Sequence, residues 1–162
     1  MSGFIINLAA LRPGLSRVGV SASAAELDLP GEWPAQVEAE LQVDRTHDRV
    51  TVRGPVQATA RLECVRCLRT FDLPVRVELE VFADRSGSAR GLEADLARDD
   101  YMKFHDGRQL DLREATRELL LLEMPITPRC REECRGLCLT CGADLNLGPC
   151  GCSAGVPSSG GA

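Results

Sequence analysis

The residues best suited to chemistry in this chain are its eight cysteines, which fall in four close pairs. No cysteine stands alone, and the pairs are Cys64 with Cys67, Cys130 with Cys134, Cys138 with Cys141, and Cys150 with Cys152. Cysteines two to four residues apart suit metal chelation, because a tight turn directs both sulfur atoms at one ion. Four pairs supply the ligands of two tetrahedral all-cysteine sites, a donor set typical of structural zinc rather than catalytic zinc.

Three other uses of paired cysteines stay open. Disulfides are disfavoured because Met1–Asn7 has neither the basic segment nor the long apolar run of a secretory signal, which predicts a reducing, cytoplasmic location. Thioredoxin-like redox chemistry is disfavoured because strand-like sequence lies on both sides of Cys64 and Cys67, whereas a redox motif joins a strand to a helix. An iron–sulfur cluster would use the same thiolates, and spacing alone does not exclude it.

The spacing of the pairs favours one division of the ligands. The run Cys138-Leu-Thr-Cys141-Gly142 resembles a zinc knuckle, in which the glycine allows a positive φ angle. A short loop then leads to the last pair, so we expect one zinc site from Cys138, Cys141, Cys150 and Cys152. The other zinc site would use Cys64, Cys67, Cys130 and Cys134. The rival division groups the second pair with the third and the first pair with the fourth.

The sequence offers no catalytic constellation. It contains no phosphate-binding loop, dinucleotide fingerprint or nucleophile elbow. His47 and His105 are its only histidines, and both lie in polar stretches that we predict to be turns at the surface. No apolar run approaches the ~20 residues of a membrane-spanning helix. We therefore predict a protein that is not an enzyme, with no catalytic residues, no small-molecule substrate and no membrane contact.

The elements that must position the cysteines are mainly strands. Alternation of apolar and polar residues predicts strands over residues 37–43, 49–53, 56–63 and 71–81. The first cysteine pair falls in the turn between the last two of these strands. Because short turns join consecutive strands, we expect an antiparallel meander.

A helix should follow the sheet, over residues 111–123. Asp111-Leu-Arg-Glu114 resembles a capping box at its start, and Pro125 ends it. Its expected apolar stripe consists of Leu112, Ala115, Leu119, Leu120 and Leu122. The predicted fold class is α+β: an antiparallel β-sheet meander with one packed C-terminal helix and a small zinc-ribbon-like C-terminal module.

The expected domain organisation has three parts. Residues 1–129 form the sheet domain with its helix, and residues 130–152 form the cysteine-rich zinc module. Residues 153–162, rich in small residues, form a disordered tail. A polar loop or linker over residues 83–100 interrupts the sheet domain and could hold one turn of helix at Gly91–Asp100.

Charge points to two kinds of partner. The 162-residue chain has a formal net charge of −5, which suits a basic protein better than naked nucleic acid. Arginines nevertheless flank the first two cysteine pairs, at positions Arg61, Arg66, Arg69, Arg129, Arg131 and Arg135. If these two pairs share an ion, the six arginines converge and could bind RNA phosphates, or could only offset the thiolate charge.

Three motifs in order resemble the YceD family, the large ribosomal RNA subunit accumulation proteins. They are Leu62-Glu-Cys-Val-Arg-Cys-Leu68, the helical stretch Asp111–Pro125, and Gly136–Asn146 followed by Cys150-Gly-Cys152. The resemblance spans roughly Ile5 to Cys152. It implies a cytoplasmic factor that promotes accumulation, processing or assembly of large-subunit (23S) ribosomal RNA, with that RNA or a pre-ribosomal particle as partner. The alternative is an adaptor that holds a basic ribosomal protein or a maturation enzyme without touching RNA.

Overall fold

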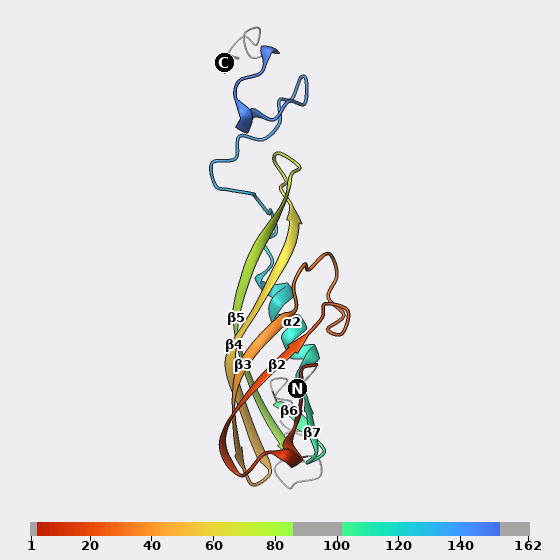
Figure 1. Ribbon diagram of the computed structural model, residues 1–162, viewed down its shortest axis with the longest axis vertical. Helices are drawn as coiled ribbons and strands as arrows, with labels where there is room; N and C mark the ends of the chain where they lie inside the picture. The colour runs from red at the N-terminus through yellow and green to blue at the C-terminus, as the bar shows by residue number, and fades with distance from the viewer. Residues whose placement is uncertain (1–2, 86–101, 153–162) are drawn as a thin grey trace. The chain divides into compact units, whose positions relative to one another are not determined.

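The computed structural model of this chain describes residues 3–85 and 102–152 (Figure 1). The turn of helix expected at 91–100 and the tail 153–162 lie outside these residues. The chain divides into two compact units, Met1–Ala60 with Pro74–Met124 and Arg61–Leu73 with Pro125–Ala162. We call them unit 1 and unit 2. The turn 61–73 thus groups with the C-terminal cysteines, whereas the sequence analysis assigned it to the sheet domain.

The described part of the chain forms two sheets and one α-helix. The larger sheet has the order β2-β3-β4-β5-β6. Its strands are β2 Gly14–Ala22, β3 Val37–Thr46, β4 Arg49–Glu63, β5 Thr70–Arg85 and β6 Met102–His105. The smaller sheet pairs β1 (Ile5–Asn7) with β7 (Gln109–Asp111) in antiparallel fashion. The fold is therefore α+β with mainly antiparallel sheets, as the sequence predicts.

Most neighbours in the larger sheet are antiparallel. The strand β3 pairs antiparallel with both β2 and β4. Three ion pairs join β4 to β5: Arg49–Asp84, Arg53–Glu80 and Arg61–Asp72. From the first pair to the last, the residue numbers rise on β4 and fall on β5. That descending order is the antiparallel arrangement. These two long strands frame the turn that carries Cys64 and Cys67.

The prediction of a purely antiparallel meander is wrong at one edge, because β5 pairs with β6 in parallel. A meander follows only where short turns join consecutive strands. Sixteen residues, 86–101, separate these two strands, and that length is enough for the crossover that parallel pairing requires.

The predicted alternation fixes which face of each strand is buried. On β3, Val37, Leu41 and Val43 are buried, while Glu38 and Glu40 are exposed. The core of unit 1 lies on the buried side and includes Phe4, Ile6, Leu8, Leu27, Leu79, Leu110, Leu112 and Leu120. Helix α2 runs along this face of the sheet (Figure 1).

Helix α2 spans Arg113–Glu123, close to the predicted range, but its start and its buried face differ from the prediction. The predicted capping box forms only in part. Asp111 Oδ1 accepts from the Arg113 backbone amide at 2.9 Å, but Glu114 pairs with Lys103 instead, and the N-cap residue Leu112 makes no side-chain cap hydrogen bond. The buried helical residues are Thr116 and Leu120, whereas Leu122 is 82% exposed. No helix among the described residues has the length and apolarity to cross a membrane.

Candidate metal centres

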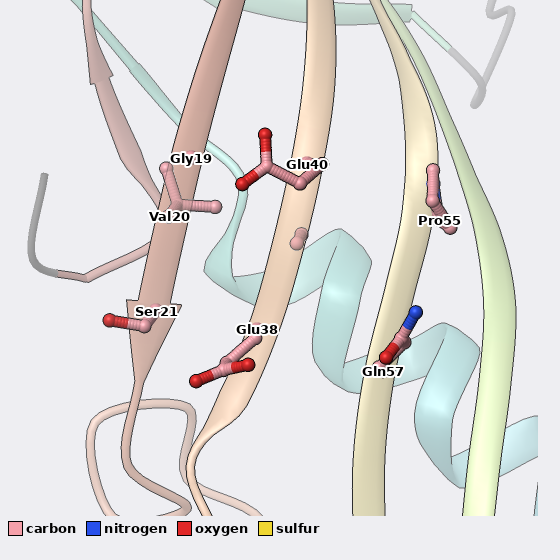
Figure 2. Close-up of a pocket in the computed structure, with 8 residues that line it drawn as sticks. Gly19, Val20, Ser21, Glu38, Glu40, Pro55 and Gln57 are labelled. Atoms are coloured by element: carbon pink, nitrogen blue, oxygen red, sulfur yellow. The ribbon is translucent and has the colours of Figure 1, made fainter.

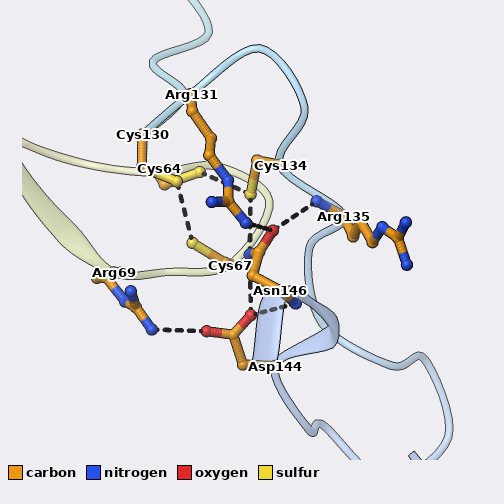
Figure 3. Close-up of polar contacts among 9 residues, drawn as sticks. All are labelled: Cys64, Cys67, Arg69, Cys130, Arg131, Cys134, Arg135, Asp144 and Asn146. Atoms are coloured by element: carbon orange, nitrogen blue, oxygen red, sulfur yellow. Dashed lines mark hydrogen bonds and ion pairs between the residues drawn. The ribbon is translucent and has the colours of Figure 1, made fainter. Parts of the chain in front are cut away.

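Four sulfur atoms from distant parts of the sequence meet in unit 2 (Figure 3). They belong to Cys64, Cys67, Cys130 and Cys134, and all lie within 4.8 Å of one another. The Cys64–Cys134 and Cys67–Cys130 Sγ distances are both 3.7 Å. A zinc ion bound to four thiolates at about 2.3 Å requires sulfur atoms about 3.8 Å apart at the corners of a tetrahedron. The residues therefore fit a tetrahedral four-thiolate ion.

We call this group the buried cluster. Cys64, Cys67 and Cys134 are each at most 6% exposed, and Phe71, Cys130 and Leu137 pack against them. The turn between β4 and β5 supplies the first two ligands, and the Val65 amide donates to the Pro128 carbonyl at 2.9 Å. In unit 2 the described buried hydrophobic group consists of the cysteines themselves, so little other apolar material supports this unit.

The other four cysteines form a second group, the outer cluster. The sulfur atoms of Cys138, Cys141, Cys150 and Cys152 also lie within 4.8 Å of one another. None of these residues is buried, and Cys141 is exposed. No disulfide joins any of the eight cysteines. The two groups have the composition that the sequence analysis favoured, and the rival division would separate sulfur atoms that the structure brings together.

The protein provides hydrogen bonds that stabilise thiolates in both clusters. Burial alone would raise the pKa of Cys64, but backbone amides of Cys67 and Cys130 outweigh it and lower that pKa to about 6. The backbone amides of Cys141 and Thr140 lower the pKa of Cys138 to about 6. Burial and neighbouring thiols raise the pKa of Cys130 to about 12.

The lowered pKa of Cys64 and the raised pKa of Cys130 have a common physical explanation. Four thiolates cannot share so small a volume without a cation, because like charges raise the pKa of one another. A divalent cation would remove that repulsion, and its binding would displace the remaining protons. The donor set therefore suits an ion of charge two or more.

Two residues that the sequence analysis did not assign hold the buried cluster in place. The Asn146 amide group donates to the Cys134 sulfur at 3.4 Å, and its Oδ1 accepts from the Arg135 backbone at 2.9 Å and from Arg131 at 3.0 Å. Asp144 accepts from the Asn146 backbone at 2.9 Å. Figure 3 shows these contacts beside the sulfur atoms. The spacing Asp144-x-Asn146 is the sequence feature that could have identified these two residues, since Asp and Asn side chains form local turns with the backbone two residues on.

The six candidate RNA-binding arginines all lie in unit 2, but their environments differ. Four of them hold unit 2 together through side-chain contacts. Arg61 pairs with Asp72 at 2.8 Å, Arg69 pairs with Asp144 at 2.9 Å, Arg66 donates to the Cys134 carbonyl at 3.0 Å, and Arg131 donates to Asn146.

Arg129 and Arg135 are exposed, and among the described residues no side-chain ion pair involves them. The Arg135 guanidinium group points away from the buried cluster in Figure 3. These two are the best placed of the six to meet an external phosphate.

The histidines are not part of either cluster. His47 is exposed in a turn, as predicted. The prediction for His105 is wrong, because it ends β6 and is only 5% exposed. Its Nε2 lies 2.8 Å from the Asp48 carbonyl, and its Nδ1 accepts from the Gly107 amide at 3.0 Å. The ring thus closes a turn in unit 1, since its two nitrogens both have protein partners.

The fold and site define a class: an α+β protein in which two four-cysteine clusters, each able to hold a metal ion, organise a small unit whose described residues form almost no other core. The family model described as "Large ribosomal RNA subunit accumulation protein YceD" matches residues 52–159. The chain belongs to the YceD family.

Comparison with curated proteins gives relatives in bacteria and plants. An uncharacterized protein of Mycobacterium leprae (strain TN) is 32% identical over 147 residues, covering 91% of this chain and 64% of that protein. The chloroplastic proteins named "Large ribosomal RNA subunit accumulation protein YCED homolog 1" are 28% identical in Zea mays and 27% identical in Arabidopsis thaliana. The matches cover 74% and 85% of this chain, and 50% and 49% of those proteins. The chain thus spans 49% to 64% of these relatives' length. No solved structure matches it.

Proposed function

We propose that this chain is a non-enzymatic, cytoplasmic ribosome biogenesis factor that promotes accumulation, processing or assembly of large-subunit ribosomal RNA. In this proposal two structural zinc ions occupy the buried and outer clusters, and the residues 130–152 form a zinc-ribbon-like module. The partner is ribosomal RNA or a pre-ribosomal particle. The family description supports the ribosomal role, and the arginines beside the buried cluster carry the proposal of direct RNA contact.

Zinc is the ion that best suits the clusters. All-cysteine sets with tetrahedral spacing and no open position favour structural zinc over catalytic metals. Asn146 adds a hydrogen bond to a ligand sulfur, the type of support that orients ligands around structural metals. The role of the metal is then to hold the arginine-bearing segments in place, and no chemical step depends on it.

RNA contact rests on the two arginines whose guanidinium groups have no ion pair among the described residues. Arg129 and Arg135 flank the second cysteine pair, so metal binding orders the backbone that carries them. Each arginine that meets a phosphate releases counterions and makes binding depend on salt. The other four arginines stabilise unit 2 through the contacts described above. Among these four, only an arginine whose guanidinium group is not paired with a carboxylate also contacts phosphate.

The test is binding of fluorescently labelled large-subunit rRNA transcripts, measured by anisotropy at several salt concentrations. Arg129→Glu with Arg135→Glu should weaken binding at least tenfold and reduce the slope of log K against log [salt] by about 1–2. Replacing Arg12 and Arg17, exposed in unit 1, by Glu gives the same charge change as a control and should leave binding nearly unchanged. Equal losses in both double variants would show a general charge effect and contradict the proposed site.

A second measurement links binding to the cellular role. In cells that lack the protein, the wild-type chain should restore the ratio of large- to small-subunit rRNA, whereas the Arg129 and Arg135 double variant should not. Full restoration by that variant would contradict RNA contact as the basis of the function.

A second candidate function, a protein-binding adaptor without RNA contact, is favoured by hollows on the exposed face of the sheet. One hollow of about 370 Å³ is lined by Glu38, Glu40 and residues of β2 and β4 (Figure 2). A neighbouring hollow of about 440 Å³ shares Glu38 and Gln57 with it. Figure 2 shows the two carboxylates on the side of the strands opposite α2. Such a surface suits lysine or arginine side chains of a basic ribosomal protein.

The adaptor function predicts that basic ribosomal proteins stay bound to the purified chain after nuclease treatment. Glu38→Gln with Glu40→Gln should release them, while the matched pair Glu118→Gln with Glu123→Gln on α2 should not. Loss of every ribosomal protein on nuclease treatment of the wild-type chain would exclude this candidate.

A further inference from the structure

The two CxxC turns of unit 2 have the same backbone hydrogen bonds. In the first turn, the Cys64 amide donates to the Arg69 carbonyl and the Leu68 amide donates to the Cys64 carbonyl, both at 2.9 Å. In the second turn, the same two hydrogen bonds, at 2.8 and 2.9 Å, join the corresponding residues Cys138, Ala143 and Gly142. Leu68 and Gly142 therefore occupy equivalent positions, directly after the second cysteine of each turn.

Equivalent positions require the same backbone conformation, and only one of them holds a glycine. The φ angle is +74° at Gly142 and +60° at Leu68. Glycine adopts this left-handed conformation without penalty, whereas a side chain such as leucine is strained there. A leucine at this position therefore opposes the fold that its turn requires.

Packing does not compensate for that strain. The Leu68 side chain is 56% exposed, and Val65 on the same turn is 51% exposed. The turn that carries Cys64 and Cys67 thus exposes two aliphatic side chains to solvent, and the left-handed backbone of Leu68 makes one of them energetically costly. Strained residues that folding does not need concentrate at binding sites.

The charges of the turn indicate the occupant. Between Cys64 and Arg69 the turn contains two exposed arginines and no acidic residue. Arg69 pairs with Asp144, whereas Arg66 donates to the uncharged Cys134 carbonyl and has no ion pair among the described residues. An apolar side chain beside such an arginine suits a nucleic acid, because the arginine attracts phosphates while the apolar group packs between bases that it partly unstacks. A purely apolar protein pocket would gain nothing from the charge of Arg66.

We propose that Leu68, with Val65 beside it, is an apolar wedge that inserts at a weakly stacked base step of structured RNA, such as a bulge or internal loop. The proposal rests on the RNA contact proposed above and names what that contact recognises. Arg66 keeps the wedge at the phosphate backbone, and the buried cluster gives it a rigid base. The turn with Gly142 has the same backbone but lacks both arginines and the wedge.

The experiment compares the wild-type chain with Leu68→Gly and Leu68→Asn, both of which suit a positive φ angle. The probes are labelled large-subunit rRNA transcripts for affinity, and an RNA hairpin with 2-aminopurine in an internal loop for unstacking. Both variants should keep a thermal midpoint at or above that of the wild-type chain. They should bind the transcripts at least fivefold more weakly with an unchanged salt slope, and lose the 2-aminopurine fluorescence increase.

A matched control separates the wedge from general apolarity. Leu139→Ala removes an exposed leucine from the other CxxC turn and should leave both RNA signals unchanged. If the wild-type chain binds no RNA, the proposed function fails. If the wild-type chain and Leu68→Gly bind equally, only the wedge is refuted. If Leu68→Gly keeps RNA affinity but releases a ribosomal protein, the turn that carries Val65 and Leu68 binds protein, and the proposal of an RNA wedge is wrong.

Discussion

At the residue scale, the hydroxyl group of Thr116 makes a testable contribution to stability. Thr116 is fully buried in α2, and its Oγ1 has no hydrogen-bond partner among the described residues. A buried polar group without a partner costs about 1–3 kcal/mol. Thr116→Val keeps the shape and removes the hydroxyl, so it should raise the free energy of unfolding by about 1 kcal/mol, measured by chemical denaturation.

The matched control keeps the hydroxyl and removes the methyl group. Thr116→Ser should lower stability by about 1 kcal/mol, because it leaves the same polar group with less packing. A loss of stability in Thr116→Val would mean that the hydroxyl has a partner that stabilises it.

Single residues were also where sequence reasoning about burial was least reliable. The spacing of apolar residues placed Leu122 on the buried face of the helix, but the buried positions follow the spacing of Leu112, Thr116 and Leu120. Thr116 forms part of that buried face, and a search for apolar residues alone could not identify it. The prediction for His105 was wrong for a related reason: its Nε2 contacts the carbonyl of Asp48, 57 residues away in the sequence, and no local pattern encodes that contact.

At the element scale, the close approach of β3 and β4 depends on Gly54. A Cβ atom at this position would clash with the Glu40 carbonyl oxygen and lie 3.1 Å from the Leu41 Cα. Both atoms are backbone, so neither can move aside without displacing its strand. Gly54→Ala should therefore lower the free energy of unfolding by about 1–3 kcal/mol, measured by chemical denaturation.

Gly19→Ala is the control for this effect, because its Cβ would meet only the flexible carboxylate end of Glu40, at 3.1 Å. We expect a change of less than about 1 kcal/mol there, since that side chain can rotate away. Equal losses in the two variants would contradict a specific backbone clash at Gly54.

Strands with a strong alternation of apolar and polar residues were predictable from the sequence. A strand with weak alternation was missed. The run Val37–Val43 alternates cleanly and became β3 with the predicted buried face. The strand β2, Gly14–Ala22, was missed because glycine and serine dilute its alternation, although Val18 and Val20 are buried. The parallel pairing of β6 with β5 could not be foreseen, because sixteen residues separate the two strands and no local pattern sets the direction in which the second strand pairs.

At the scale of the whole molecule, the cysteine spacing was informative because metal geometry is local. Ligand pairs in tight turns restrict which sulfur atoms can meet, so the grouping now seen was already favoured from the sequence. What spacing could not give was the difference between the clusters. The first cluster is buried where Phe71 and Leu137 pack against it and Asn146 donates to a ligand sulfur, whereas no cysteine of the second cluster is buried.

Metal removal should affect the two units differently. Native mass spectrometry of the purified chain should show two zinc ions. A strong chelator should then abolish amide-exchange protection in residues 61–73 and 125–152, because in the described residues the core of unit 2 is built from the cysteines. Unit 1 has a separate aliphatic core, so its strands β2 and β3 should stay protected. Global loss of protection on chelation would contradict independent support of unit 1.

Loss of a single ligand should distinguish the clusters from each other. Cys67→Ser removes a buried ligand from the cluster that joins the turn 61–73 to residues 130–134, so it should expose both segments to exchange and lower the thermal midpoint markedly. Cys150→Ser removes a ligand from the outer cluster, so exchange should rise only within 138–152 and the midpoint should change little. Each variant should keep one of two zinc ions by native mass spectrometry. Equal midpoint losses, or loss of both ions from either variant, would mean that the clusters depend on each other, and the outer cluster would then be needed to hold the arginines that we propose contact RNA.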